Sequence, residues 1–418
     1  MNEIPKQIEV GPPSVMDHQL APLLPRFNLF DSTRELEDSA LYSKVRNEID
    51  RVLGSVVQEN LAPEVDSSHS RIRAAAWNIE RGVELEGLLQ VLSQHPLLKT
   101  SDILLLTELD YGMARTQNLF VAREIAKALA LNYAFAPCYI ALDKGSGLES
   151  NVAGENAHSF HGNALFSRHP VREVHSIALP NGRDLMRGKE KRLGTQRAVV
   201  AIIDHPSGAF WAVSLHLDAH STQRHRHLQM TMVLNHLETL SPALPVLIGG
   251  DWNTSTHNSR RALYSILGYC RRVLMGVHHV LENHYPHPDR WFERHLFREL
   301  EVRGYRYRDL NEPGTCTLHY NIQDLAANNR MADWIPNWCF WFINWALEKN
   351  GGRCSMKLDW FAGKDLFPDP DSKPRVLGEV HDENEMLSDH DPIVLDFRLN
   401  PRQEAAPSNP SPGNQLRE

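Results

Sequence analysis

One stretch in the middle of the chain joins an apolar run to two polar groups. Residues 246–248 are typical of a buried strand, and the run ends on Gly249 and Gly250. Asp251 and Asn253 follow two positions apart, and because side chains alternate along an extended chain, both can point the same way. A carboxylate and a carboxamide at a strand end favour chemistry on a polar substrate. From these residues alone, an ordinary Gly-Gly-Asp turn is an equally good interpretation.

Polar residues end five further predicted strands. In chain order they are Asn78, Glu108, His216, Asp359 and the segment Ser-Asp-His-Asp at 388–391. Any one of them has an ordinary structural interpretation, since Asn and Asp form turns and a histidine can lie in a core. Six such ends in one chain instead indicate a common polar site.

The elements that must position these residues are short strands that alternate with helices. The pattern predicts strands at 72–77, 103–106, 162–167, 198–203, 210–215, 357–361 and 393–399, and helices at 118–131 and 222–240. His-Pro-Ser-Gly at 205–208 is typical of a hairpin turn. Antiparallel pairing is therefore expected beside strand–helix units.

The two ends of the chain fall outside this pattern. Residues 1 to about 30 are rich in proline, which predicts an extended or partly disordered arm. Ser32 and Glu35 have capping-box spacing and predict one amphipathic helix that continues as far as Pro63. We therefore expect an N-terminal arm and helix over 1–70, a main domain over 71–400 and a disordered tail over 401–418.

Residues 256–355 interrupt the strand pattern and predict an inserted helical subdomain. Four tryptophans recur there at helical spacing and form one stripe: Trp334, Trp338, Trp341 and Trp345. The rest of that helix is also apolar, which favours burial in the core of the subdomain. The alternatives are an aromatic wall over the active site and a contact with a membrane. The histidines of the insertion lack the spacing of a zinc site, so zinc is disfavoured.

Composition limits the partners and the compartment. The formal net charge of -8 argues against a broad basic surface that binds nucleic acid non-specifically. The five cysteines are odd in number and scattered, which is typical of reduced thiols. No secretory signal is recognisable, and the longest apolar run, 338–347, is too short to cross a bilayer. The expected location is cytoplasmic, and a protein partner cannot be predicted from the sequence.

Eight short motifs resemble those of the endonuclease/exonuclease/phosphatase superfamily, the deoxyribonuclease-like metal-dependent phosphoesterases. They are Trp-Asn-Ile-Glu-Arg-Gly at 77–82, Thr-Glu-Leu-Asp at 107–110, Gly-Asn-Ala-Leu-Phe-Ser-Arg at 162–168, Gln-Arg-Ala at 196–198, Ser-Leu-His-Leu at 214–217, Gly-Asp-Trp-Asn at 250–253, Leu-Asp-Trp at 358–360 and Ser-Asp-His at 388–390. The resemblance covers about residues 72–399. It implies an α/β fold, a four-layer sandwich of two mixed β-sheets packed face to face with helices outside.

Hydrolysis of a phosphate ester needs a cation, a base and donors to the phosphoryl oxygens, because the ester's negative charge repels the attacking water. Glu108 and Asn78 offer oxygen ligands, which suit Mg²⁺ or Mn²⁺ better than zinc. The resemblance implies that Asp389 completes this metal site or holds a second ion. Asp251 is the candidate base that orients and deprotonates the water, as the resemblance also implies.

The remaining candidates contact the phosphate or support those that do. Asn253 and Asn163 are expected to steady the nucleophile and the phosphoryl oxygens. His390 is expected to contact the phosphate as a cation held by Asp359, because a neighbouring carboxylate raises the pKa of a histidine. His216 is the expected second donor to the phosphate or the proton source for the leaving group.

Two arginines have open interpretations. Arg115 lies in the polar loop after Glu108, where it either contacts a substrate phosphate or lies at the surface and caps the next helix. Arg197 matches a family position, where it binds substrate or acts structurally.

The predicted function is hydrolysis of phosphate esters with a divalent metal, with a phosphodiester favoured over a monoester. A nuclease on DNA or RNA is an alternative that the net charge disfavours. A sphingomyelinase-like lipid phosphodiesterase is an alternative favoured only by the tryptophan-rich insertion. A catalytically inactive binding relative is disfavoured, since the acidic and histidine positions of the pattern are all present.

Overall fold

A computed structural model describes residues 9–63, 70–254, 258, 262–321, 339–348, 351–383 and 387–399. Within these ranges the main chain forms two large mixed sheets and a short ribbon. No helix of the described residues is both long and apolar enough to span a membrane. The four cysteines whose side chains are described, Cys138, Cys270, Cys316 and Cys354, are free thiols.

The first sheet has ten strands and contains the N-terminal half of the site. Its order is β1 (Val10–Gly11), β2 (Val56–Glu59), β5 (Asn132–Ala141), β6 (Phe160–Ser167), β4 (Ile103–Tyr111), β3 (Ile72–Arg81), β17 (Ile393–Leu399) and β15 (Leu366–Pro368). Two short strands lie off this path, β8 (Arg192–Gly194) beside β5 and β16 (Arg375–Val376) beside β17. The central pair β3 and β4 is parallel, and β6 and β17 flank it in antiparallel orientation.

The second sheet has five strands and contains the Gly-Asp-Trp-Asn turn. Its order is β14 (Asp359–Lys364), β11 (Val246–Asp251), β10 (Gly208–Ser214), β9 (Gln196–His205) and β7 (Val171–Leu179). β10 and β11 are parallel, and the other neighbours are antiparallel. The predicted hairpin at 205–208 is confirmed, since Gly208 pairs with His205.

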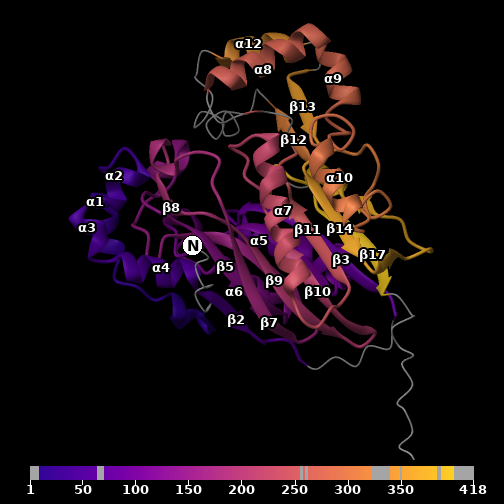
Figure 1. Ribbon diagram of the computed structural model, residues 1–418, viewed down its shortest axis with the longest axis horizontal. Helices are drawn as coiled ribbons and strands as arrows, with labels where there is room; N and C mark the ends of the chain where they lie inside the picture. Colours follow the sequence, from indigo (N-terminus) through magenta and orange to yellow (C-terminus); the bar gives the residue numbers. More distant parts are fainter. Residues whose placement is uncertain are drawn as a thin grey trace, which may run out of the picture.

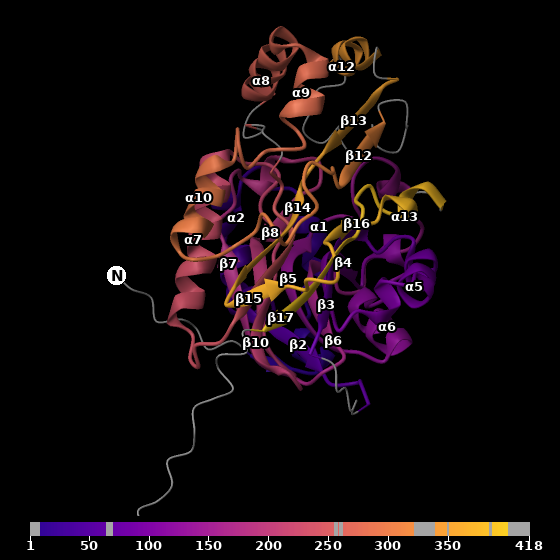
Figure 2. The same ribbon diagram turned by 90° about the vertical axis from the view of Figure 1, so that its right-hand side faces the viewer.

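The two sheets pack face to face, with helices on both outer faces. Ala74 and Leu105 of the first sheet share a buried cluster with Val199, Phe210 and Leu247 of the second. The outer face of the first sheet is covered by α4 (Arg46–Gly54), α5 (Leu85–Gln94) and α6 (Val121–Leu129), and that of the second by α7 (Gln223–Thr239) and α10 (Arg294–Val302). Figure 2 shows these layers edge-on, with α7 and α10 on the left and α5 and α6 on the right. The predicted four-layer α/β sandwich is confirmed, and because most strands are covered on both faces, they contain continuous apolar runs.

The single N-terminal helix predicted from Ser32 to Pro63 is wrong. The chain forms α2 (Thr33–Glu37), α3 (Ala40–Ser43) and α4, after which β2 begins. Ser32 Oγ accepts the Glu35 N–H at 3.2 Å as expected of a cap. Ser39 Oγ accepts the Tyr42 N–H at 3.1 Å, so a second cap interrupts the first helix.

The segment before these helices is not a loose arm in the part that the structure describes. It contains η1 (Pro13–Met16), η2 (Ala21–Leu23) and α1 (Leu24–Phe27). Met16, Leu20 and Phe27 are completely buried in the core under the first sheet. Packing of these three side chains fixes a proline-rich segment that has no regular periodicity. The predicted tail, 401–418, lies outside the described residues.

The insertion is only partly a separate helical unit. It contains α8 (Ala262–Met275), α9 (Val277–Asn283), α10, β12 (Leu318–Asn321), α12 (Cys339–Leu347) and β13 (Arg353–Met356). Leu296 and Phe297 of α10 join the core under the second sheet. In Figure 1, α8, α9 and α12 instead form the end of the molecule at the top, joined to the sandwich through β12 and β13.

The prediction that the tryptophan stripe is buried also needs correction. Trp334 and Trp338 lie outside the described residues, but Trp341 is 68% exposed and Trp345 is 59% exposed. The predicted burial of these two side chains is wrong. Their helix is apolar on several faces, and it buries Leu347 while the two tryptophans face outward.

The remaining short helices lie in connections. They are η3 (Leu98–Thr100), η4 (Ala114–Thr116), η5 (Gly147–Asn151), η6 (Leu185–Arg187) and α13 (Gly378–Glu383).

Candidate active site

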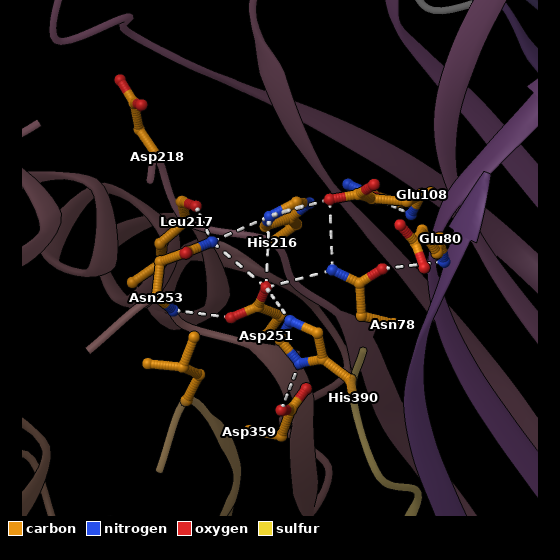
Figure 3. A network of polar contacts seen from close by, with 12 residues as sticks. Asn78, Glu80, Glu108, His216, Leu217, Asp218, Asp251, Asn253, Asp359 and His390 are labelled. Carbon is orange, nitrogen blue, oxygen red and sulfur yellow. Dashed lines mark hydrogen bonds and ion pairs between the residues drawn. The ribbon is translucent and has the colours of Figure 1, made fainter. Parts of the chain in front are cut away.

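Seven of the predicted site residues come together where ends of the two sheets meet (Figure 3): Asn78, Glu108, His216, Asp251, Asn253, Asp359 and His390. Asp251 is the last residue of β11, and it pairs across the ladder with Asp359, the first residue of β14. From the other sheet, Asn78 of β3 pairs with Thr107 of β4, which places Asn78 beside Glu108. One edge of the sandwich thus gathers three carboxylates and one carboxamide from four strands.

The two glycines before Asp251 let β11 pass close to its neighbours. Gly250 has φ +135°, and a Cβ there would lie 2.2 Å from the Leu215 carbonyl oxygen. Only glycine fits, because other residues would clash and seldom adopt this conformation. The strand end that presents Asp251 therefore depends on Gly250.

Backbone strain marks both halves of the site. Glu108 has φ +59° and Asn253 has φ +49°, a region that non-glycine residues seldom occupy. Glu108 sits where the pairing of β4 with β6 shifts register, between Leu106 and Leu109. The irregular backbone changes the direction of the side chain at the strand end.

Asp251 lies between two histidines. Its Oδ2 is 3.4 Å from His216 Nε2 and 3.7 Å from His390 Nε2, and its Oδ1 accepts the Asn253 N–H at 2.8 Å. Burial raises the pKa of Asp251 to about 6, although both histidines act in the opposite direction. A carboxylate with this pKa can take a proton from water near neutral pH.

Asn253 fixes the relative positions of Asp251 and His216. Its Nδ2 lies 2.9 Å from His216 Nε2, 3.0 Å from the Leu217 carbonyl oxygen and 3.2 Å from Asp251 Oδ2. An amide group has two hydrogens for these three neighbours, so it cannot donate to all of them at once. Asn253 thus holds the base and a histidine side by side, which supports its predicted role beside the nucleophile.

His390 is held by a buried carboxylate. Its Nδ1 lies 2.7 Å from Asp359 Oδ2, and both side chains are almost completely buried. Burial alone would lower the pKa of His390, but Asp359 and Asp251 raise it well above its ordinary value. The raised pKa favours the protonated form of His390, and its Nε2 faces the base.

Glu108 and Asn78 form the opposite wall of the site. Asn78 Nδ2 donates to Glu108 Oε1 at 3.1 Å and to Asp251 Oδ2 at 3.2 Å, while Asn78 Oδ1 accepts the Glu80 N–H at 3.1 Å. Burial alone would raise the pKa of Glu108, but nearby His216 and Arg81 hold it below its ordinary value. Asn78 was predicted as an oxygen ligand of a metal; in this structure its nitrogen faces the carboxylates, and ligation through Oδ1 requires the amide to rotate.

The donor set fits a divalent metal ion. Glu108 and Asp389 are partly exposed carboxylates, with side chains 23% and 36% exposed. Asp389 Oδ1 lies 4.0 Å from His390 Nε2, so both carboxylates border the group around Asp251. Such an oxygen-rich set is typical of sites for hard cations.

Asn163 supports Glu108 through the backbone. Its Oδ1 accepts the Glu108 N–H at 3.3 Å, and its Nδ2 donates to the Arg197 carbonyl oxygen at 2.8 Å. The Arg197 guanidinium donates to Ser176 Oγ at 3.1 Å. Both residues thus make structural hydrogen bonds, in addition to the contact with substrate that the sequence predicts for them.

The structure places Arg115 away from its predicted role. Its side chain is almost completely buried, with Nε and Nη2 on Asp110 at 2.7 and 3.0 Å. Nη1 donates to Glu149 at 2.9 Å and to Glu190 at 3.2 Å. A guanidinium with three carboxylate partners is not available to a phosphate, and it is neither at the surface nor at a helix cap. We correct its assignment to a buried ion-pair network behind Glu108.

Two hydroxyl groups of the site were assigned no role from the sequence. Thr317 Oγ1 donates to Asp359 Oδ2 at 2.7 Å and accepts the Leu358 and Asp359 N–H groups, both at 3.1 Å. Ser388 Oγ donates to the Asn78 carbonyl oxygen at 2.6 Å and accepts the His390 N–H at 3.1 Å. Ser388 has a local signal, two residues before His390. Thr317 has none, because it is distant in sequence from Asp359 and lies inside the insertion.

Comparison with known proteins finds one family and a set of distant structures. The sequence profile of the Endonuclease/Exonuclease/phosphatase family matches residues 75–390. No curated protein sequence gives a significant match. Among solved structures, an endonuclease/exonuclease/phosphatase from Beutenbergia cavernae is 16% identical, with 79% of this chain and 72% of that chain covered and a TM-score of 0.45. The human Nocturnin catalytic domain with bound sulfate is 17% identical (80% and 96% covered, TM-score 0.45), and a 3'-5' exonuclease from Neisseria meningitidis is 14% identical (79% and 100% covered, TM-score 0.44).

Proposed function

The chain belongs to the Endonuclease/Exonuclease/phosphatase family, whose members are hydrolytic phosphoesterases, and we propose that it is a phosphodiesterase that uses Mg²⁺ or Mn²⁺. The observation that carries the proposal is the position of Asp251. It is a buried carboxylate with a pKa of about 6, placed between two histidines and beside the carboxylate Glu108. This arrangement combines a base, donors to a phosphate and oxygen ligands at one strand edge.

In the proposed mechanism Asp251 orients the attacking water and takes its proton. Asn253 keeps the acceptor oxygen in place through its backbone N–H. His390, charged and held by Asp359, donates from Nε2 to a phosphoryl oxygen, and His216 donates to the phosphate or to the leaving group. Glu108, Asp389 and, after rotation of its amide, Asn78 would hold a divalent metal ion, which would supply positive charge to the phosphoryl oxygens.

The charge of the site supports a phosphodiester over a monoester. A monoester carries more negative charge and needs more cations around it. The arginines described near Glu108 are already paired, Arg81 with Glu149 at 3.1 Å and Arg115 with Asp110, Glu149 and Glu190. With those arginine charges already neutralised, His390 and a bound metal ion would be the positive groups that face the phosphate.

The test is hydrolysis of bis(4-nitrophenyl) phosphate against 4-nitrophenyl phosphate, with Mg²⁺, Mn²⁺ or EDTA. We expect metal-dependent turnover of the diester, little of the monoester, and loss of both in EDTA. DNA and RNA belong in the same panel, and preferred turnover of either would replace the general proposal by a nuclease. Absence of metal-dependent turnover on every substrate would favour a binding relative without activity.

A further inference from the structure

A second histidine held by a carboxylate lies on the Glu108 side of the site. His161 of β6 pairs across the ladder with Asp110 of β4, and its Nδ1 lies 2.9 Å from Asp110 Oδ1. Asp110 is completely buried, and it also accepts from Arg115 Nε at 2.7 Å and from Nη2 at 3.0 Å. A carboxylate only accepts hydrogen bonds, so the imidazole nitrogen beside it must carry a proton. In a neutral ring, His161 Nε2 is then unprotonated and is itself an acceptor.

The charge of His161 differs from that of His390. Burial lowers the pKa of His161, and Arg115 adds to this effect, so that Asp110 and Glu108 do not raise it. For His390 the neighbouring carboxylates outweigh burial, and the pKa is raised. The site thus contains one charged histidine that donates a hydrogen bond and one neutral histidine that accepts one.

Tyr139 lies beside His161 on the next strand. The two residues pair between β5 and β6, and their rings are nearly parallel, with an interplanar angle of 15° and centroids 6.3 Å apart. The pairing shifts register between Pro137 and Tyr139, an irregularity that changes the direction of the side chain. Burial raises the pKa of Tyr139 well above its ordinary value, so its hydroxyl keeps the proton and can donate a hydrogen bond.

Both rings belong to the active-site edge of the first sheet. Glu108 lies on β4, the strand that pairs with His161, and its charge acts on the pKa of that histidine. The charges that act on the pKa of Tyr139 include Asp218, two residues after His216, and also Glu108. Tyr139 and His161 are therefore close to the residues expected to hold the metal ion and the phosphate.

The polar atoms of the two rings are open to a ligand. Within the part of the chain that the structure describes, His161 Nε2 and the Tyr139 hydroxyl have no hydrogen-bond partner, and neither atom is sealed from solvent. An acceptor beside a donor matches a hydroxyl group, which can donate to the first and accept from the second. A phosphoryl oxygen of a diester does not match Nε2, because both are acceptors.

We propose that Tyr139 and His161 form a subsite for a free hydroxyl group of the alcohol esterified to the phosphate, so that the substrate is a phosphodiester of a polyol. The phosphodiester rests on the proposed function, and the hydroxyl rests on the geometry of the two rings. The substrate hydroxyl donates to His161 Nε2 and accepts from the Tyr139 hydroxyl. Arg115 and Asp110 fix the tautomer that leaves Nε2 open, which gives the buried ion-pair network behind Glu108 a positioning role.

The test compares two diesters that differ only in hydroxyl groups, 2,3-dihydroxypropyl 4-nitrophenyl phosphate and propyl 4-nitrophenyl phosphate, after subtraction of the rate without enzyme. We expect wild type to prefer the first by about tenfold or more in kcat/KM. Tyr139→Phe and His161→Phe should each lower this ratio about three- to tenfold, because each removes one hydrogen bond. The same preparation turns over both substrates, so any loss of folded protein cancels in the ratio.

Tyr133→Phe is the matched control. Tyr133 is also a buried tyrosine of β5, but its hydroxyl donates to Glu59 at 2.6 Å, so this variant should keep the ratio of wild type. Equal turnover of the two diesters by wild type, or an equal fall of the ratio in the control, would overturn the subsite while the proposed function stands. Turnover of neither diester would contradict the proposed function itself. Calorimetry would then decide the subsite, which requires glycerol 1-phosphate to bind wild type more tightly than propyl phosphate.

Two further measurements test the role of His161. Nitrogen NMR of the ring at neutral pH should show a proton on Nδ1 and none on Nε2, and a proton on Nε2 would remove the acceptor and overturn the proposal. Titration calorimetry with Mn²⁺ should give the same affinity for His161→Phe and wild type. A loss of about tenfold would instead make His161 a metal ligand, since ligating histidines also donate their other ring nitrogen to a carboxylate.

Discussion

Asp359 Oδ2 lies 2.7 Å from His390 Nδ1 and accepts the Thr317 hydroxyl at the same distance. One carboxylate oxygen of β14 thus joins a histidine of the C-terminal loop to a threonine of the insertion. The carboxylate keeps His390 charged, and the threonine fixes the direction of the carboxylate. These two functions can be separated by mutation.

Asp359→Asn should lower kcat by about a hundredfold, because the carboxamide no longer keeps His390 cationic. Thr317→Val keeps the carboxylate charge and should cost about tenfold or less, although it removes the hydrogen bond to Asp359 Oδ2 and the two that Oγ1 accepts. NMR titration of the His390 ring should show its pKa falling toward the ordinary value in Asp359→Asn and staying high in Thr317→Val. An unchanged His390 pKa in Asp359→Asn would contradict the assigned role of this carboxylate.

Asp251→Asn should lower kcat for the diester by about a thousandfold, because the base is lost and the shape is kept. The melting temperature should not fall, since a buried carboxylate whose pKa is raised by burial is replaced by a neutral group. Calorimetry and steady-state kinetics on the same preparation check both parts. Near-normal turnover by this variant would remove Asp251 from the mechanism.

Glu108→Gln should weaken metal binding about tenfold to a hundredfold, because a charged ligand is replaced by a neutral one. Titration calorimetry with Mn²⁺ measures this without reference to activity. Glu86→Gln is the control, since Glu86 lies in the first turn of α5 and outside the site. Equal affinity of Glu108→Gln and wild type would place the metal elsewhere.

Arg115→Met should destabilise the fold by about 3–5 kcal/mol, because it removes a buried guanidinium from Asp110 and Glu190, which keep only His161 and Arg192 as partners. KM of the fraction that remains folded should change little. Urea unfolding measures the first effect and kinetics the second. A large rise in KM with unchanged stability would restore the substrate contact predicted from the sequence.

His205 should make the fold sensitive to acid. Burial and neighbouring His169 lower the pKa of His205 to about 4 from 6.5. Between these two values the unfolded chain binds the proton more readily, so the stability present above pH 6.5 is lost as the pH falls through 4, to an extent on the order of 3 kcal/mol. Urea unfolding from pH 7 to pH 4 should show a flatter profile for His205→Gln than for wild type, with exposed His278→Gln as control.

The sequence predicted the strands of the site because each one ends in a polar residue after an apolar run. β3, β4, β10 and β11 follow this rule, and the family assignment drawn from their ends is confirmed by the match over residues 75–390. β5 was missed, although all ten of its residues are buried. Pro137 interrupts its apolar run, and no polar site residue follows it. The two features that marked the other strands, an apolar run and a polar residue at its end, were therefore missing.

The errors have physical causes that lie in tertiary structure. The N-terminal helix is interrupted because Ser39 caps a second helix, a choice that the apolar spacing does not reveal. Arg115 has the sequence context of a phosphate ligand, and only the fold brings Glu149 and Glu190 to its other nitrogens. Trp341 and Trp345 have the spacing of a core helix, and their exposure depends on which face of α12 the rest of the insertion covers.

The hydroxyl of Thr317 also limits how this protein can be re-engineered. Residues 256–355 look like a cassette that could be exchanged between relatives to change specificity. Exchange of the whole segment would also remove Thr317 and the β12 strand that is bonded to the 388–391 loop, and so would disturb Asp359 and His390. A chimaera that keeps residues 315–321 and 353–358 and replaces α12 would alter the surroundings of the active site and leave the bonds of Thr317 and β12 to the catalytic residues intact.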